Sequence, residues 1–562
     1  MIRTIFLERP PLVPLRRSGL NIGNIRTANP GVRALYGRIN MHLNAPEMWQ
    51  GAFELACMLT VDPLREAVTG MILQAVERGE NASFPGSFTD QLYTARAALS
   101  LAEYTADKDL LKRLAEWCRW IEVNWDQVIA LERVRVQPAD FMEFLIRFYL
   151  MTGAKAALRL CARLRSGAMD WATALHSYGT VGRLKDNVLT DDPQVILDSP
   201  DLDETDYQKR LCILNHGEML ADGMRYTAFS GLFSGNGQEL SAGERGWRFI
   251  RKSDGAACGG TCGAPFLCGR SSHQPVSVEV LAAWMEAFGA QLLVSEGTWP
   301  LDEMIRIGFN GLRDALRENS LQMVQYLNQL EIGTDIRENS REEHVLARCA
   351  RAVSVFYRWA AGLSAGTLHL HYPLAGKYLI PGKKAVVTMN SHAAEIRVRD
   401  TSELGLAVYA AATETREMLV CHGKQEITVH SSGEPLSEIR EGKLYQTETK
   451  IHDQDRIEWK NRQAVRFERV HHQGLCFWAE NQIRVLKTDQ EWRYAATGNA
   501  LCTEEGAVQV EAAPVSSWRV RDHRPVEIPV LPARAGEPLL LQTTPYAGTD
   551  GRIAIFPRAA AE

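Results

Sequence analysis

The feature that most constrains this chain is a helix-turn-helix scheme that recurs from about residue 30 to about residue 365. Residues 48–79 place apolar side chains at helical spacing on both sides of Asp62-Pro63, which predicts two helices joined by a turn. Residues 92–125 and 139–164 repeat the scheme. Repeated helix pairs bury their apolar faces only by stacking on neighbours, so we predict an (α/α)6 helical toroid over residues 31–365. An irregular helical bundle is the alternative.

The pattern changes after about residue 366. Short β-branched or alternating runs follow, such as residues 383–390, 393–400, 404–412 and 424–431, and Gly, Asn, Asp and Ser separate them. We therefore predict a multidomain α and β chain, in which an antiparallel β-sandwich of one or two units over residues 366–562 follows the toroid. Residues 1–30 are predicted to be an N-terminal extension that packs on the sandwich.

Charge and apolar content exclude several classes of protein. The chain has 63 basic and 68 acidic residues and no basic block, which argues against a nucleic-acid partner. The N-terminus lacks the pattern of a secretory signal, and no apolar run is long enough to span a membrane. Eleven cysteines, an odd number scattered along the chain, are typical of reduced thiols. We expect a cytoplasmic protein.

Several phrases, in order along the chain, resemble the bacterial β-L-arabinofuranosidase family, glycoside hydrolase family 127 and its relatives. They are WQGAFELACMLTVDPLREAVTGMI at 49–72, ADFMEFLIRFYLMTG at 139–153, LNHGEMLADGMRYTAFSGL at 214–232, PLDEMIRIGFNGL at 300–312 and VQYLNQLE at 324–331. The resemblance implies a sugar-binding funnel at one end of the toroid. It also implies a zinc ion, held by one glutamate and three cysteines, that tunes a nucleophilic cysteine thiolate.

The sequence departs from that family at the zinc site. Ser277 stands where the resemblance implies the glutamate, and Glu279 stands where it implies a cysteine. Arg341 and Glu342 fall at the paired cysteines. We therefore expect no cofactor, and a zinc-thiolate site is not predicted.

The glycine-rich stretch CGGTCGAPFLCGRSSH at 258–273 is the remaining place for a metal. Cys258, Cys262, Cys268 and His273 lack the close C-x2-C spacing of structural zinc sites, so these cysteines are weak candidates for zinc. The alternative is a loop in which glycines serve backbone turns and which shapes a substrate pocket, with His273 as a substrate contact.

Carboxylates replace the thiolates in our interpretation. Glu279, Glu342 and Glu343 open two helices that the resemblance implies face each other, and paired carboxyl groups can act as acid and base or as nucleophile. Acidic residues that only favour the helix dipole are the alternative. His216 matches a family histidine by position and completes the predicted catalytic set. The predicted substrate contacts are Asp140, Glu143, Glu218, Gln91, Tyr326, His344 and His273.

These features favour a glycoside hydrolase that acts on a small oligosaccharide or glycoside with carboxylate acid/base chemistry. Two alternatives stay open: a non-catalytic sugar-binding or structural descendant, and a polysaccharide lyase that uses Tyr326, His216 and Arg341. A carbohydrate is the expected partner, and the resemblance leaves a homodimer open as the assembly. Two of the predicted carboxylates within about 5–10 Å of each other across one pocket would favour the hydrolase.

Overall fold

The structure, a computed structural model, describes most of the helical region and the strands that follow it. Described are residues 13–14, 16–17, 30–178 apart from 60, 80 and 81, 213–316 apart from 265, 271, 273 and 296, 324–329, and 342–372. Beyond residue 372 it describes the strands and some of the turns between them. No helix of the described part is long and apolar enough to cross a membrane.

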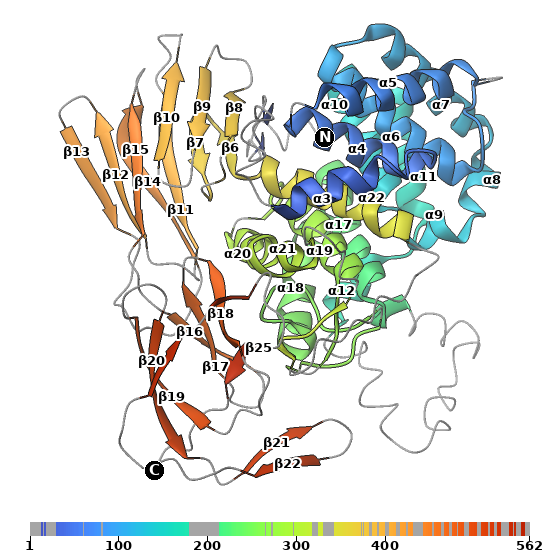
Figure 1. The fold of residues 1–562 in the computed structure, drawn as a ribbon. Helices are drawn as coiled ribbons and strands as arrows, with labels where there is room; N and C mark the ends of the chain where they lie inside the picture. Colours follow the sequence, from blue (N-terminus) through green and yellow to red (C-terminus); the bar gives the residue numbers. More distant parts are fainter. Residues whose placement is uncertain are drawn as a thin grey trace.

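Six helices of the described part contact one another in a closed ring (Figure 1). In ring order they are α4 (Pro46–Leu59), α6 (Phe88–Thr105), α10 (Ala139–Thr152), α17 (Gly217–Ser234), α19 (Val278–Gln291) and α22 (Glu342–Arg358). Each helix contacts the next, and α22 packs back against α4.

A second set of helices packs against this ring. It comprises α3 (Pro30–Ile39), α5 (Asp62–Glu77), α7 (Lys108–Val123), α11 (Lys155–Gly167), α18 (Gly237–Asp254) and α20 (Trp299–Arg306). Helix α3 contacts α22 and α4, α5 contacts α4 and α6, and α7, α11, α18 and α20 contact α6, α10, α17 and α19 respectively. Shorter helical segments are α8 (Trp125–Ile129), α9 (Glu132–Val136), α12 (Trp171–His176), α21 (Leu312–Ala315) and a π-helical turn at Ile307–Gly311.

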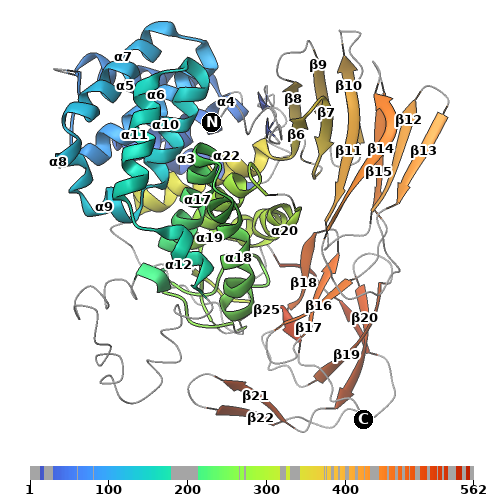
Figure 2. The ribbon, with the colours of Figure 1, turned by 180° about the vertical axis from the view of Figure 1, so that it is seen from behind.

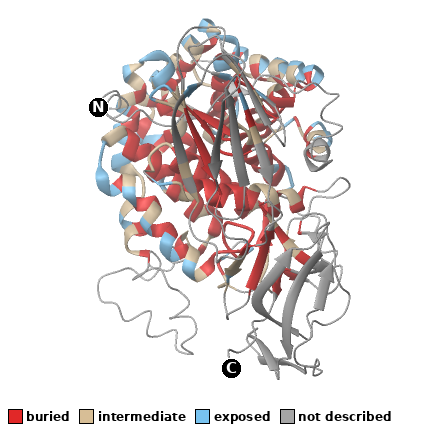
Figure 3. Ribbon diagram, turned by 90° about the vertical axis from the view of Figure 1, so that its left-hand side faces the viewer, coloured by how far each residue is buried: buried red, intermediate tan, exposed pale blue. Residues whose placement is uncertain are grey.

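Sequence pattern explains why the two sets differ. Helix α7 buries Leu110, Leu114, Trp117 and Ile121 on one face, as expected of a surface helix. In helix α19 every residue except Glu279 is buried, as expected of a helix enclosed on all sides. Figure 3 shows buried residues throughout the helical part and exposed residues along its outer edge.

Local signals fix where the helices begin and end. Ser87 and Asp90 form a reciprocal capping box at the start of α6. Gly153 and Gly235 end α10 and α17 with φ of 70° and 71°, a left-handed conformation that glycine adopts without steric cost. Helix α4 ends at Leu59 and α5 begins at Asp62 with Pro63 in its first turn, so the predicted break between two helices is present but lies just before Asp62-Pro63.

Two sheets follow α22 and lie along one side of the helices (Figure 2). The first has the order β1 (Val13–Pro14), β6 (Ala361–Ser364), β7 (Thr367–Leu370), β11 (Leu404–Ala410) and β14 (Lys443–Ile451). The second has the order β13 (Gln425–His430), β12 (Arg416–His422), β15 (Arg456–Asn461), β10 (Ala393–Val398), β9 (Ala385–Met389), β8 (Gly376–Ile380) and β2 (Arg16–Arg17). Val13 pairs with Leu363 and Arg16 with Leu379, so strands from near the N-terminus join both sheets.

The remaining strands form smaller sheets. One contains β16 (Arg466–Arg469), β17 (Leu475–Ala479), β18 (Gln482–Lys487), β25 (Arg552–Ile553) and β5 (Asn328–Gln329), with β24 (Thr544–Pro545) and β26 (Ile555–Phe556) beside it. The others are β19 (Tyr494–Cys502), β20 (Ala507–Pro514) and β23 (Leu539–Gln542); β21 (Ser517–Arg521) and β22 (Pro525–Pro529); and β3 (Val276–Ser277) and β4 (Val324–Gln325).

Buried and partly buried polar contacts join the helical region to the strand region. Glu468 of β16 accepts from Arg251 of α18 at 3.1 Å and from Arg306 of α20 at 2.6 Å. Asn310, in the π-helical turn, donates to the Asn481 carbonyl oxygen and accepts from the Ile483 amide. The predicted order, helices first and strands second, is confirmed. One pairing differs from an all-antiparallel sandwich, because β7 and β11 run parallel.

Candidate active site

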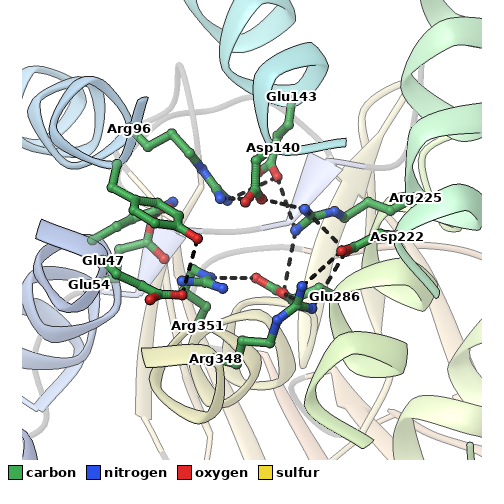
Figure 4. A network of polar contacts seen from close by, with 12 residues as sticks. Glu47, Glu54, Arg96, Asp140, Glu143, Asp222, Arg225, Glu286, Arg348 and Arg351 are labelled. Atoms are coloured by element: carbon green, nitrogen blue, oxygen red, sulfur yellow. Dashed lines mark hydrogen bonds and ion pairs between the residues drawn. The ribbon is translucent and has the colours of Figure 1, made fainter. Parts of the chain in front are cut away.

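A set of buried ion pairs lies inside the helix ring (Figure 4). We call it the ionic lattice. Its members are Arg96, Asp140, Glu143, Asp222, Arg225, Glu286, Arg348 and Arg351. The four arginine side chains are only 3–4% exposed, and the four carboxylates match them in number. Charges buried this deeply are tolerated only when they are paired.

The lattice connects five of the six ring helices, since α6, α10, α17, α19 and α22 each contribute at least one member. Arg348 lies 2.8 Å from Asp222, and Arg351 lies 2.8 Å from Glu286. Arg225 forms ion pairs with Asp140 and, at 3.4 Å, with Glu286. Burial raises the pKa of Asp140, but Arg96 and Arg225 outweigh it and hold that pKa well below its usual range. Asp140 is therefore ionised at neutral pH.

At the N-terminal end of the ring, four side chains from four helices converge. We call Glu47 of α4, Glu218 of α17, Glu279 of α19 and His344 of α22 the mouth cluster; each lies in the first turn of its helix. His344 Nδ1 lies 2.5 Å from Glu47, and its Nε2 lies 3.3 Å from Glu218 and 3.2 Å from Glu279. Donor atoms of Glu218, Glu279 and His344 all lie within 4.8 Å of one another. Acidic groups suit this position because the helix N-termini carry partial positive charge.

The protonation of His344 follows from these neighbours. Burial lowers its pKa, but the contacts with Glu218, Glu279 and Glu47 outweigh burial and raise the pKa to about 10. Burial raises the pKa of Glu47, while the hydrogen bond and charge of His344 lower it to about 2. Glu218 behaves likewise: burial raises its pKa, and Arg348 and His344 bring it far below its usual range. At neutral pH His344 is an imidazolium between ionised carboxylates.

Glu279 has fewer hydrogen-bond and ion-pair partners than the other two carboxylates of the cluster. Arg348 contacts Glu218 at 2.6 Å, and the Tyr93 hydroxyl donates to Glu47 at 3.1 Å. The ion pair recorded for Glu279 within the described residues is with His344, and its buried Oε1 is not aligned there for a hydrogen bond. Glu279 therefore retains acceptor capacity for an incoming group.

His216 and Phe266 lie beside this cluster. His216 directly precedes α17, and its charge contributes to the lowered pKa of Glu218. The ring of Phe266 packs edge-on against the His216 ring at 5.3 Å between centroids, although Phe266 is 51% exposed. An exposed aromatic ring at the edge of a polar cluster is suited to stacking on an apolar ligand face.

The cysteine stretch is a folded turn and part of the protein interior. Cys258 and Cys262 are fully buried, and Trp284 of α19 donates to Thr261 within the stretch at 3.1 Å. Gly259, Gly260, Gly263 and Gly269 all have positive φ. The glycines therefore serve backbone turns, as the alternative reading of this stretch expected.

The resemblance-implied zinc-thiolate centre does not fit these residues. Within the described residues, Glu218, Glu279 and His344 bring together ligand atoms that could hold a metal ion. This group contains no cysteine, so Cys258, Cys262 and Cys268 do not join it. One imidazole nitrogen and two carboxylate oxygens are nevertheless ligands that a divalent cation accepts.

The structure separates other predicted site residues from the cluster. The side chains of Glu342 and Glu343 are 46% and 59% exposed. Glu342 pairs with Arg38 in α3, and Glu343 pairs with His42 just after α3, so neither carboxylate is available in the mouth cluster for catalysis. The reason is geometric: each helical residue advances by about 100°, which turns them outward when His344 faces inward.

Four predicted substrate contacts have structural partners instead. Asp140 and Glu143 belong to the ionic lattice. Gln91 accepts from Trp117 Nε1 at 3.1 Å and donates to the Gly86 carbonyl oxygen, so its amide faces α7. Tyr326 lies between β4 and β5, where its carbonyl oxygen accepts from the Tyr546 hydroxyl. His273 and Arg341 lie outside the described residues.

Sequence reasoning missed Glu47 and the arginines that organise the site. A signal was present: buried helices carry charged residues at helical spacing, such as His344, Arg348 and Arg351 in α22. Residues spaced by four and three positions share one helical face. A charged face on an otherwise apolar, enclosed helix indicates partners across the ring.

Comparisons with known proteins give a fold likeness. No family model matches the chain, and no curated protein matches its sequence. The structure is similar to a solved protein described as a glycoside hydrolase, with TM-score 0.65, 11% identity and 98% of each chain covered. It is also similar to a GH127 β-arabinofuranosidase, with TM-score 0.62, 10% identity and 98% of each chain covered.

A third similar structure is a GH127 β-L-arabinofuranosidase from Geobacillus stearothermophilus T6, with TM-score 0.60 and 11% identity over 94% of this chain and 93% of that one. The resemblance that the sequence suggested is thus confirmed for the fold. At these identities the likeness concerns fold alone, and the residues of the mouth cluster have to be argued from their own chemistry.

Removing one cation from the ionic lattice tests its role in stability. Arg225→Met leaves Asp140 and Glu286 buried with less compensation, so we expect the free energy of unfolding to fall by about 3–5 kcal/mol. Denaturant unfolding followed by circular dichroism measures this. The matched control is Arg248→Met, which removes an exposed i,i+4 pair with Glu244 and should cost about 0.5 kcal/mol. Equal effects of the two substitutions would contradict the lattice.

The raised pKa of His344 predicts a pH dependence of stability. A pKa of about 10 in the folded protein against 6.5 unfolded gives stabilisation that is complete below pH 6.5 and lost as pH rises to about 10. The loss amounts to at most about 5 kcal/mol. Unfolding across this pH range should show a steeper decline for the wild type than for His344→Gln. Parallel curves would show that His344 is not held as an imidazolium.

Proposed function

We propose that the chain hydrolyses glycosidic bonds in a small oligosaccharide or glycoside, and that the mouth cluster is its catalytic site. The observation that carries this proposal is the convergence of Glu218, Glu279 and His344 within 4.8 Å at one end of the helix ring. The fold likeness to glycoside hydrolases supports the reaction class.

In this proposal the ring and its outer helices form an (α/α)6 toroid. The pairs α4–α5, α6–α7, α10–α11, α17–α18 and α19–α20, with α22 beside α3, each supply one ring helix and one covering helix. The first turns of the ring helices then surround the substrate. Carboxylates at several helix N-termini are favourable in such a funnel because the backbone dipoles stabilise them.

The roles of the residues follow from their ionisation. Glu218, held ionised by Arg348, faces the positive charge that develops at the anomeric carbon and can form the covalent bond to it. Glu279 Oε1, 3.2 Å from His344 Nε2, receives the proton once substrate binding aligns the two groups, and passes it to the leaving oxygen as the glycosidic bond breaks. Water then attacks the anomeric carbon, the bond between that carbon and Glu218 breaks and releases the Glu218 carboxylate, and the proton of the water passes to Glu279 and from there back to His344 Nε2.

The spacing of the two carboxylates favours retention of configuration. Carboxyl groups lie about 5–5.5 Å apart in retaining glycosidases and about 6.5–9.5 Å apart in inverting ones. Oxygens of Glu218 and Glu279 within 4.8 Å of each other match the shorter class. His216 and the exposed ring of Phe266 supply a hydrogen-bonding group and a stacking surface at the edge of the site.

A sugar-binding descendant without catalysis is the second candidate. The observation in its favour is that Glu47 and Glu218 are both tied to cations, which reduces their freedom to react. A polysaccharide lyase has no comparable observation, since the described contacts of Tyr326 are away from the mouth cluster.

The catalytic role of Glu279 is tested by Glu279→Gln, assayed on aryl arabinosides, galactosides, rhamnosides and glucuronides. We expect kcat to fall about 100- to 10,000-fold because the substituted amide cannot transfer a proton. KM should change little. The matched control is Glu343→Gln, an exposed carboxylate in the first turn of α22, which should keep the wild-type rate.

Equal activity of Glu279→Gln and the wild type would remove Glu279 from the mechanism. Saturable sugar binding by calorimetry, without turnover of any glycoside in the panel, would assign the chain to the non-catalytic class.

Removing metal ions tests the chemistry independently. If carboxylates and His344 act alone, protein dialysed against a chelator keeps both its hydrolytic rate and its melting temperature. Loss of both, with recovery on adding zinc or manganese, would assign Glu218, Glu279 and His344 to a divalent cation instead.

A further inference from the structure

A cavity of about 280 Å³ lies at the opposite end of the helix ring from the mouth cluster. We call it the distal cavity. Its lining includes Glu54 of α4, Glu103 of α6, Met151 of α10, Phe229 of α17 and Arg358 of α22. Each of these residues lies in the C-terminal half of its helix, whereas the mouth cluster occupies the first turns. The volume is close to the lower end of the range for small-molecule sites, about 300–1,000 Å³.

The ionic lattice separates the two ends of the ring. Glu143, Arg225, Glu286 and Arg351 belong to the lattice and also line the distal cavity. Their contacts with one another include Arg351 to Glu286 at 2.8 Å. The cavity is therefore a site of its own, with a floor of paired charges.

The walls of the distal cavity combine apolar side chains with the charged ones. Phe229, Leu232, Leu293, Val355 and Trp359 line it. Near its edge Leu150 and Met151 are 49% and 37% exposed, so the lining reaches the protein surface there. Exposed large apolar side chains beside a cavity are typical of a surface that receives a ligand.

Three arginines of this lining, Arg96, Arg225 and Arg358, have a nitrogen without a hydrogen-bond partner among the described residues, and Arg358 is the accessible one, with a side chain 31% exposed against 3% for the other two. The recorded ion pair of Arg358 is a long one, 3.6 Å to Glu54, and its buried Nε lacks a hydrogen-bond partner. The Glu54 carboxylate has other partners, since it accepts hydrogen bonds from Gln50 at 3.1 Å and from Ser100 at 2.9 Å. Arg147, the neighbouring arginine, has Glu103 at 2.7 Å.

The charge balance of the cavity favours an anion. Five arginines and four glutamates line it, which leaves one positive charge. Helix C-termini contribute partial negative charge at this end, but that effect decays within one turn and the arginine side chains oppose it.

We propose that the distal cavity binds a small carboxylate with an apolar body, with the carboxylate on the Arg358 guanidinium and the body against Phe229, Leu293 and Trp359. An arginine forms two parallel hydrogen bonds with such a group, and the apolar walls bury the rest of the ligand. The ligand class is thus a short aliphatic or aromatic carboxylic acid. This site does not depend on the glycosidase proposal.

Isothermal titration calorimetry of the whole chain with hexanoate and benzoate tests the proposal. We expect saturable binding of both acids and at least about 10-fold weaker binding of hexanol and hexylamine, which lack the anionic group. Arg358→Gln should weaken hexanoate about 10-fold or more, whereas Arg358→Lys, which keeps the charge, should restore part of the affinity. Arg248→Gln, at an exposed arginine, is the matched control and should bind like the wild type.

Equal binding of hexanol and hexanoate, unchanged binding in Arg358→Gln, or no binding of either acid would each overturn the proposal. Glu279→Gln should leave hexanoate binding unchanged, because Glu279 lies beyond the ionic lattice. Weakened hexanoate binding in Glu279→Gln would place the acid in the mouth cluster and overturn the proposal as well.

Discussion

The buried ionic lattice is the interaction on which the rest of the structure depends. Four arginines with side chains 3–4% exposed are held inside a ring of helices whose other buried residues are mostly apolar. Desolvation makes such charges costly, so the ring is stable only when every arginine meets its carboxylates in the right geometry. Because the partners come from helices far apart in the sequence, the lattice links these helices across the ring.

The lattice gives the two ends of the ring different chemistry. Toward the helix N-termini, Arg348 keeps Glu218 ionised beside His344 and Glu279, and this is where the proposed hydrolysis takes place. Toward the C-termini, the same lattice forms the floor of the distal cavity. There the Arg358 guanidinium has a long ion pair with Glu54 and an Nε without a hydrogen-bond partner in the described part of the chain. The fold resembles that of GH127 enzymes, yet the converging donors at its mouth are oxygen and nitrogen atoms without a thiolate.

Sequence periodicity was enough to predict the succession of helices and strands, since burial on one face or on all faces leaves a readable pattern. The family resemblance, and not the periodicity, made Glu279 and His344 candidate site residues, and the structure brings these two side chains to 3.2 Å. Sequence patterns could not tell which first-turn side chains face inward: Glu342, Glu343 and His344 are adjacent, and only the packing of α22 against α4 and α19 turns His344 into the ring. Glu47 was not predicted as a site residue because acidic residues are common in the first turn of any helix, where the helix dipole favours them.

The most direct test of the central claim is a crystal structure of the protein with a bound glycoside or monosaccharide. We predict that the sugar lies at the N-terminal end of the ring, with a hydroxyl or the anomeric carbon next to Glu279 and Glu218 and one face near Phe266. A sugar bound elsewhere, with the mouth cluster untouched, would contradict the assignment of this cluster as the functional site.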